Sequence, residues 1–180
     1  MPLERRQLHW TVIDRQPRLA LEVGTWKGGG STLQIVTALV ANGGGHLHTC
    51  EPDKAFYEQA CSVFRGGLLE RYVTLHNKKS GEVIRELLEA GRVPDFLFFD
   101  GPEDPQVALD DINALSPHLP AGTTLMMHDW LSPESVKQRL IKPYLANSEE
   151  WCITNVLGPP HSVGLVTAVK LSAPSGVVAR

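Results

Sequence analysis

One stretch of the sequence, residues 18–31, restricts the fold more than any other. From Arg18 to Val23 the chain is a nearly continuous apolar run, and this run stops at Gly24. A strand without alternation of apolar and polar residues is typical of a parallel sheet that helices cover on both faces. A glycine-rich turn then leads to Ser31, which can cap a helix. The order of strand, glycine-rich turn and helix predicts an α/β fold in which this strand is central.

The rest of the chain repeats this alternation, and its last two β-runs differ. Further strands are expected at 46–50, 72–76, 95–99 and 123–127, and helices at 31–41, from 52–53 onward, at 80–90, 106–115 and 133–145. The runs 152–156 and 164–170 are joined by a Gly-Pro-Pro turn that is too short for a crossover helix, so they must form a hairpin. The sequence therefore predicts a Rossmann-like, doubly wound, seven-stranded sheet, mostly parallel with an antiparallel C-terminal hairpin strand.

Length and composition favour one domain and exclude several classes of protein. The 180 residues, 42% of them hydrophobic, predict a single domain over residues 1–171, with an N-terminal helical segment at 1–17 and a loose tail at 172–180. A net charge of −3 without a long basic run speaks against nucleic-acid or membrane partners. The three cysteines have no CxxC spacing, which favours reduced thiols in the cytoplasm.

The glycine-rich turn suits a nucleotide but lacks two common motifs. A dinucleotide-binding turn needs glycine at position 26, where this chain has Trp26. A P-loop needs Lys and then Ser or Thr directly after its second glycine, but here Gly29 is followed by Gly30 and Ser31. NAD and ATP are therefore disfavoured as ligands. The alternative is a tight turn whose glycines serve only close helix packing.

An acidic residue, Glu51, ends the second predicted strand 27 residues after Gly24. In this topology a carboxylate at that place accepts both hydroxyls of a ribose. A ribose site without room for a pyrophosphate indicates a nucleoside ligand such as S-adenosylmethionine. The alternative is that the charge of Glu51 complements the dipole of the following helix.

Two further carboxylates, Asp100 and Asp129, end the fourth and fifth predicted strands. The carboxyl ends of parallel strands share one edge of the sheet, so both side chains should face one cleft, where they need a compensating charge. Oxygen ligands suit Mg or Mn, and His128 is a candidate third ligand or a general base. The alternatives are an Asp-Gly-Pro turn at Asp100, a helix cap at Asp129 and a hydrogen-bonded rim histidine at His128. His46 and His48 are expected to be strand residues rather than a metal site.

Five segments occur in order: LALEVGTWKGGGST, HLHTCEPD, LHNKKSGEVI, PDFLFFDGPED and LPAGTTLMMHDW. Together they resemble the class I S-adenosylmethionine-dependent methyltransferases, in particular the catechol O-methyltransferase-like and cephalosporin-hydroxylase-like branches, from Arg18 to Leu171. The resemblance implies methylation of a hydroxyl oxygen on a small metabolite or sugar. It also implies which residues bind the cofactor: Glu22, Gly24, Thr25, Trp26, Gly28, Gly29 and Ser31 near the methionine end, Glu51 at the ribose, Lys79 and Ser80 near the adenine, and Asp100.

The same resemblance implies metal ligands and leaves the catalytic base open. In the metal-dependent members the aspartates that match Asp100 and Asp129 are ligands, but their Asp-Asn pair is Asp129-Trp130 here, and their catalytic lysine is Glu103. The candidate catalytic residues are therefore His128, Asp100 and Glu103, and the candidate metal ligands are Asp100, Asp129 and His128.

These departures keep two other functions open, and the short N-terminus suggests how the cleft is covered. The alternatives are a non-catalytic adenosyl-binding partner subunit and a nucleoside-processing hydrolase that uses Asp100 and His128. Only 17 residues precede Arg18. We therefore expect a homodimer in which the neighbour, or the segment Leu8–Val12 with Trp10, covers the cleft.

Overall fold

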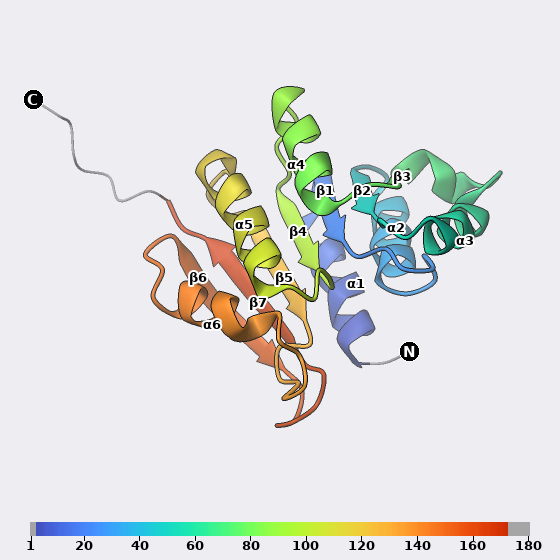
Figure 1. Cartoon of the computed structure of the whole chain (residues 1–180). Coiled ribbons are helices and arrows are strands. Elements are labelled where there is room, and N and C mark those ends of the chain that lie inside the picture. The colour runs from blue at the N-terminus through green and yellow to red at the C-terminus, as the bar shows by residue number, and fades with distance from the viewer. Residues whose placement is uncertain (1–2, 173–180) are drawn as a thin grey trace, which may run out of the picture.

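The computed structural model describes residues 3–172, which form alternating strands and helices (Figure 1). The helices are α1 (Leu3–Arg15), α2 (Ser31–Asn42), α3 (Lys54–Phe64), α4 (Ser80–Glu89), α5 (Pro105–Leu115) and α6 (Gln138–Ala146). The strands are β1 (Leu19–Val23), β2 (His46–Cys50), β3 (Val73–His76), β4 (Phe96–Phe99), β5 (Thr124–His128), β6 (Trp151–Leu157) and β7 (Leu165–Lys170). Short 3₁₀ helices at Leu68–Tyr72 and Ser116–His118 were not expected from the sequence.

Within residues 3–172 the strands form one seven-stranded sheet in the order β3-β2-β1-β4-β5-β7-β6. Strand β1 pairs in parallel with β2 and β4, whereas β7 is antiparallel to both β5 and β6. The predicted fold class and the antiparallel C-terminal hairpin are confirmed. The first strand is central, so its carboxyl end lies between those of β2 and β4.

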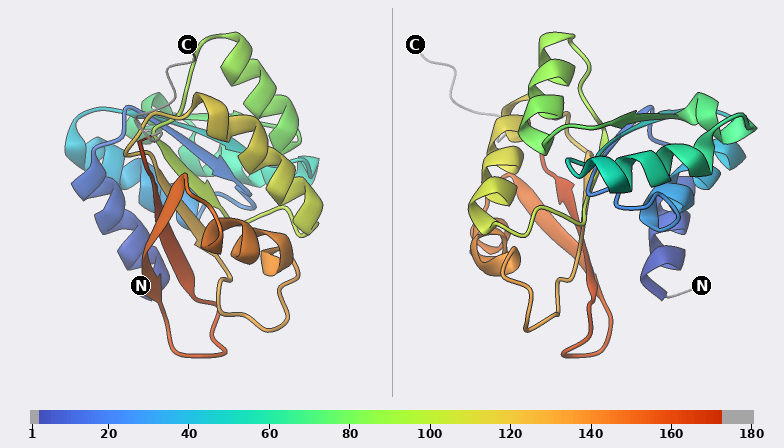
Figure 2. Two further views of the ribbon diagram at one scale, coloured as in Figure 1. Left: turned by 90° about the vertical axis from the view of Figure 1, so that its left-hand side faces the viewer. Right: turned by 45° about the vertical axis from the view of Figure 1, so that its right-hand side comes forward.

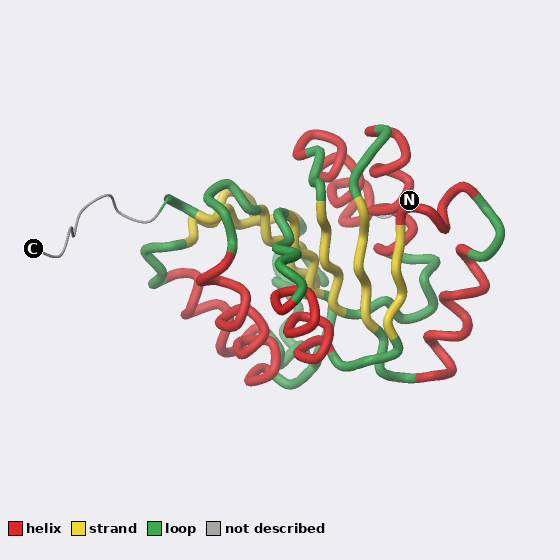
Figure 3. The backbone as a smooth tube through the Cα atoms, turned by 90° about the horizontal axis from the view of Figure 1, so that it is seen from above, coloured by secondary structure: helices red, strands yellow, loops and turns green. Residues whose placement is uncertain are grey.

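Helices cover both faces of this sheet, and each face has its own apolar cluster. Leu8 of α1, Ile35 of α2 and Phe64 of α3 belong to one cluster. Val83 of α4 and Ile141 of α6 belong to the other, together with residues of α5. Figure 2 shows α1 on one side of the strands with α5 and α6 on the other, and Figure 3 shows the strands side by side from above. This double cover explains why β4 consists of buried apolar residues and why β1, apart from the buried Glu22, is apolar without alternation.

The structure corrects one helix boundary next to the predicted site. A helix was expected over 133–145, but α6 begins only at Gln138. Asp129 has a positive φ of 58° and turns the chain, and the amides of Trp130 and Leu131 then donate to the carbonyls of Gly164 and Val163. The segment after β5 is therefore bound to the chain that leads into β7, and α6 begins five residues later than expected.

Two further observations concern the ends of the chain and its helices. The loose tail predicted at 172–180 lies, apart from Ser172, outside the described residues. Within the described part, no helix combines the length and the apolar character that a membrane crossing requires.

Candidate active site

The glycine-rich turn after β1 touches the turn after β4 backbone to backbone. Gly24 has a φ of 99°, and a Cβ atom there would lie 3.0 Å from the amide nitrogen of Gly101 and 3.1 Å from the carbonyl carbon of Asp100. Only glycine combines this backbone conformation with so close an approach. The two turns thus form one continuous wall at the carboxyl edge of the sheet.

The next glycines have separate roles. A Cβ atom on Gly28, which has a φ of 75°, would lie 3.0 Å from Cα of Ala60 and 3.1 Å from the Phe64 ring, so this glycine lets the turn pack on α3. Gly29 has no atom within 4 Å of such a position among the described residues. Neither residue lines either of the two cavities described below, whereas Gly30 and Ser31 line the smaller one. The contacts of Gly28 favour the packing alternative at this position, and the cofactor role of Gly28 and Gly29 stays a prediction.

Glu22 lies beneath the turn and does not line either cavity described below. Its side chain is fully buried in β1, and the hydroxyls of Thr32 and Thr49 each donate to Oε2 at 2.7 Å. Burial raises the pKa of Glu22 to about 7, although hydrogen bonds from Ser31, Thr32 and Thr49 act in the other direction. Glu22 thus connects β1 to β2 and α2 through hydrogen bonds and does not face either cavity.

A cavity of about 560 Å³ opens beside the turn, a volume typical of small-ligand sites. Most of the residues predicted to bind the cofactor line this cavity. These are Gly24, Trp26, Glu51, Lys79, Ser80 and Asp100. Phe56, Pro102 and Val107 add apolar walls that sequence reasoning missed, because an apolar residue at a helix start carries no signal that separates ligand contact from packing.

The carboxylate of Glu51 is held in place at the end of β2. Its Oε2 accepts the Trp26 amide and its Oε1 accepts the Asp53 amide, both at 2.9 Å. Asp53, and not Glu51, caps α3, because its side chain accepts the amides of Ala55 and Phe56. The cap of α3 is thus Asp53, while the carboxylate of Glu51, which lines the larger cavity, is held just before the same helix start, so its charge can still complement the helix dipole.

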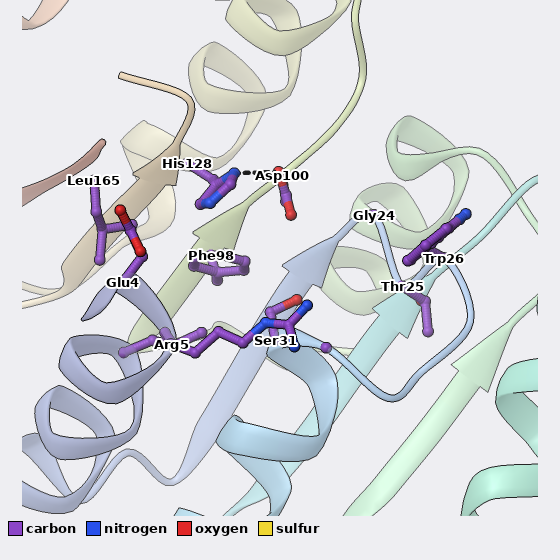
Figure 4. Close-up of a pocket in the computed structure, with 12 residues that line it drawn as sticks. Glu4, Arg5, Gly24, Thr25, Trp26, Ser31, Phe98, Asp100, His128 and Leu165 are labelled. Carbon is purple, nitrogen blue, oxygen red and sulfur yellow. Dashed lines mark ion pairs between the residues drawn. The ribbon is translucent and has the colours of Figure 1, made fainter. Parts of the chain in front are cut away.

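A second cavity of about 90 Å³ adjoins the first on the side of α1 (Figure 4). Thr25 and Ser31 of the turn form one wall and His128 lies across from them. From α1 come Glu4, Arg5 and Leu8. The prediction named the segment Leu8–Val12 as a cover, but Val12 is buried against α2 and Trp10 is 55% exposed. Of the predicted segment Leu8 does line the cavity, and Glu4 and Arg5, one turn earlier in α1, line it too. The sequence did not reveal these two because the direction of the helix across the cleft depends on tertiary packing.

The side chains at the ends of β4 and β5 meet as predicted. Nδ1 of His128 lies 3.1 Å from Oδ1 of Asp100 and 3.1 Å from Oδ1 of Asp129. Burial alone would lower the pKa of His128, but the hydrogen bonds to the two carboxylates and their charges raise it to about 9. His128 is therefore an imidazolium at neutral pH, which speaks against its predicted use as a general base. The hydrogen bond from His128, with a further one from Lys137, lowers the pKa of Asp129 to about 2 despite its burial.

A lysine that the sequence did not reveal completes this cluster. The side chain of Lys137 is 1% exposed, and its Nζ lies 2.7 Å from Oδ2 of Asp129 and 3.4 Å from Oδ1 of Asp100. Glu103, whose side chain is 74% exposed, lies 3.8 Å from the same nitrogen. Burial would lower the pKa of Lys137, but the carboxylates around it raise it, so the ammonium stays charged. Lysines are rarely buried, and this one lies in a segment predicted to be helical, so no local pattern marked it.

Comparisons with known proteins agree with this fold. Residues 21–130 match a family model described as a methyltransferase domain. Among solved structures, the O-methyltransferase TomG from Streptomyces achromogenes, involved in tomaymycin synthesis and in complex with SAM, is similar at a TM-score of 0.78 and 21% identity, covering 93% of this chain and 79% of that one. An O-methyltransferase from Bacillus cereus in complex with SAH has a TM-score of 0.77 at 20% identity, covering 94% and 81%. A methyltransferase from Geobacter sulfurreducens has a TM-score of 0.73 at 20% identity, covering 96% and 80%. No similar sequence was found among the curated proteins.

Proposed function

This chain belongs to the methyltransferase domain family, as a class I S-adenosylmethionine-dependent methyltransferase, and on that premise we propose that it methylates a hydroxyl oxygen of a small metabolite or sugar. The observation that carries the proposal is the junction of the two cavities. Gly24, Trp26 and Asp100 line both of them, so a ligand in the larger cavity reaches the smaller one at this point. A methyl donor and a methyl acceptor need such a shared boundary.

The cofactor is assigned to the larger cavity. Its ribose hydroxyls would meet Glu51, its adenine the neighbourhood of Lys79 and Ser80, and its methionine end the turn toward Ser31. Two of the similar structures are complexes with SAM or SAH, which supports this assignment. The smaller cavity would then receive the methyl group, and the acceptor hydroxyl would lie there near His128.

In the reaction that follows, the acceptor oxygen forms a bond to the methyl carbon while the bond between that carbon and sulfur breaks. The sulfonium becomes a neutral thioether, and the hydroxyl proton leaves the acceptor. The methyl group is already activated in the cofactor, so the protein contributes chiefly proximity and orientation. We assign the proton to the carboxylate of Asp100, which lines both cavities, because His128 is already protonated. Glu103 is the alternative residue to accept this proton.

Incubation with methyl-labelled cofactor and a metabolite extract tests this function. A methyltransferase transfers label to a small molecule and releases S-adenosylhomocysteine. A non-catalytic partner subunit would bind S-adenosylhomocysteine but transfer no label, and a nucleoside hydrolase would degrade an unmethylated nucleoside. Calorimetry should give low-micromolar binding of S-adenosylhomocysteine, about −8 kcal/mol, and no binding of NAD. Failure of both cofactor binding and label transfer would refute the proposal.

We also propose a homodimer in the cytoplasm. In the described residues, Trp10 and Leu3 of α1 are more than half exposed, which supports association through this helix, and all three cysteines are unpaired. Light scattering at working concentration should return about twice the 19.8 kDa of one chain. A monomer would contradict this part of the proposal without affecting the assigned reaction.

A further inference from the structure

The fit of a divalent cation between Asp100 and Asp129 depends on the groups already there. One atom each of Asp100, His128 and Asp129 lies within 4.8 Å of the others, a spacing that would suit an ion. The ammonium of Lys137, however, already contacts both carboxylates, at 2.7 Å for Asp129 and 3.4 Å for Asp100. A divalent ion between the same oxygens would face a full positive charge at contact distance without water between them. The donor set therefore fits an ammonium better than it fits Mg or Mn.

Hydrogen bonds as well as ion pairs fix Lys137 in this position. Its Nζ also donates to the backbone carbonyl of Asp100 at 3.2 Å, and the next side chain, Gln138, donates to the carbonyl of His128 at 2.7 Å. These bonds join the start of α6 to the ends of both β4 and β5. With 1% of its side chain exposed, Lys137 has no route to solvent in this arrangement, and a buried ammonium without these partners would be strongly disfavoured.

The residue after Asp129 also argues against a divalent ion at this site. In the metal-dependent relatives a ligand is expected at the residue after the second aspartate, which is Trp130 here. Trp130 is 6% exposed and belongs to the apolar cluster of α4, α5 and α6. A residue that could complete an ion's coordination is thus replaced by a core residue, while a buried cation of the protein's own approaches the same carboxylates.

We propose that Lys137 is a built-in replacement for the divalent cation, so that this methyltransferase binds no metal between Asp100 and Asp129. The ammonium of Lys137 contacts both carboxylates, at 2.7 Å for Asp129 and 3.4 Å for Asp100. Lys137 acts as a positioning residue, and the imidazole of His128 faces the smaller cavity. The site then offers an acceptor one hydrogen-bond donor instead of an ion that two adjacent oxygens could chelate. Resting on the proposed function, this predicts that the acceptor hydroxyl, of a metabolite or a sugar, is bound without chelation through a vicinal diol.

Titration of the purified full chain with Mn²⁺, followed by electron paramagnetic resonance, tests the replacement without any need for activity. We expect wild type to bind no Mn²⁺ up to about 1 mM, and Lys137→Met, which keeps much of the volume and removes the charge, to bind at least about tenfold more tightly. Arg139→Met on the exposed face of α6 removes the same charge and should behave like wild type. Micromolar Mn²⁺ binding by wild type, or equal binding by wild type and a folded Lys137→Met variant, would overturn the proposal.

A second variant covers the case in which Lys137→Met does not fold. Lys137→Met combined with Asp129→Asn removes one charge of each sign, which restores the balance, and it should fold without binding Mn²⁺. Micromolar Mn²⁺ binding by this double variant, or its failure to fold, would show that the charges of Lys137 and Asp129 do not balance each other, and would overturn the replacement. Loss of label transfer in the activity assay with these metal results unchanged would refute the proposed function and leave the replacement standing.

Discussion

Among single residues, Glu51 carries the clearest expectation for ligand binding. Replacement by alanine removes a charged acceptor of the ribose hydroxyls, worth about 1.5 to 3 kcal/mol. Affinity for S-adenosylhomocysteine should therefore fall about ten- to hundredfold. Isothermal calorimetry measures this, with Glu58→Ala, an exposed carboxylate of α3, as the control.

Because Glu51 also accepts the amides of Trp26 and Asp53, a loss in the alanine variant could come from the turn alone. Glu51→Gln separates the two effects, since its amide oxygen can still accept one of these amides. Unchanged affinity in both variants would rule out the ribose assignment.

Glu22 should make the stability of the protein depend on pH. Its pKa is about 7 in the fold against 4.5 in the unfolded chain, so the folded state binds the proton more tightly. Stability is therefore greatest below about pH 4.5 for this group and falls as pH rises to 7, by on the order of 3 kcal/mol. The variant Glu22→Gln, which cannot ionise, should lack this decline.

Urea unfolding of wild type and Glu22→Gln from pH 5 to 8 measures the difference in slope. Asp111, whose pKa burial raises to about 6, titrates in the same range but is present in both proteins. Its effect therefore cancels in the comparison. Parallel stability curves would show that Glu22 ionises as readily in the fold as in the unfolded chain.

At the scale of elements, the packing of the glycine-rich turn on α3 gives a matched pair of variants. Gly28→Ala places a Cβ atom against Ala60 and Phe64 at positive φ and should lower the free energy of unfolding by about 1–3 kcal/mol. Gly29→Ala meets no described atom and should change it by less than about 0.5 kcal/mol. Thermal or urea unfolding decides, and equal effects in the two variants would contradict the roles assigned to these glycines.

The elements that the sequence predicts best are those whose pattern is local. Unbroken apolar runs and the short Gly-Pro-Pro connection are sufficient for the sheet and its hairpin, because burial on two faces and chain length leave few alternatives. The start of α6 could not be predicted in this way. The chain before α6 is bound through the amides of Trp130 and Leu131 to residues 164 and 163, and no local pattern records a partner so far along the chain.

The same distinction applies to the site. Asp100, Asp129 and Glu51 could be placed because each ends a strand, and parallel strands end at one edge. Lys137 and Arg5 could not, because each reaches the site from a helix or a loop whose direction tertiary packing sets. The charge of His128 was also beyond the sequence, since it depends on two carboxylates at 3.1 Å.

At the scale of the whole molecule, α1 closes the smaller cavity only while it stays packed on α2. Leu8 is 1% exposed and belongs to the shared apolar cluster, so Leu8→Ala should lower stability by about 2–5 kcal/mol. Leu3→Ala on the same helix, at a side chain that is 53% exposed, should have little effect. Urea unfolding measures both, and a small loss for Leu8→Ala would show that α1 is not held by this contact.

The contact between the turns at Gly24 and Gly101 has a consequence for how the protein folds and unfolds. It joins residues 77 positions apart (101 minus 24), so a long loop must close before the wall between the two cavities exists. Ligand sites built from such distant segments are incomplete until late in folding. A cofactor that recognises only the finished wall would leave the rate of folding almost unchanged and would retard the reverse process. Saturating S-adenosylhomocysteine should thus lower the rate of unfolding and lengthen the lifetime of the native state against heat or proteases.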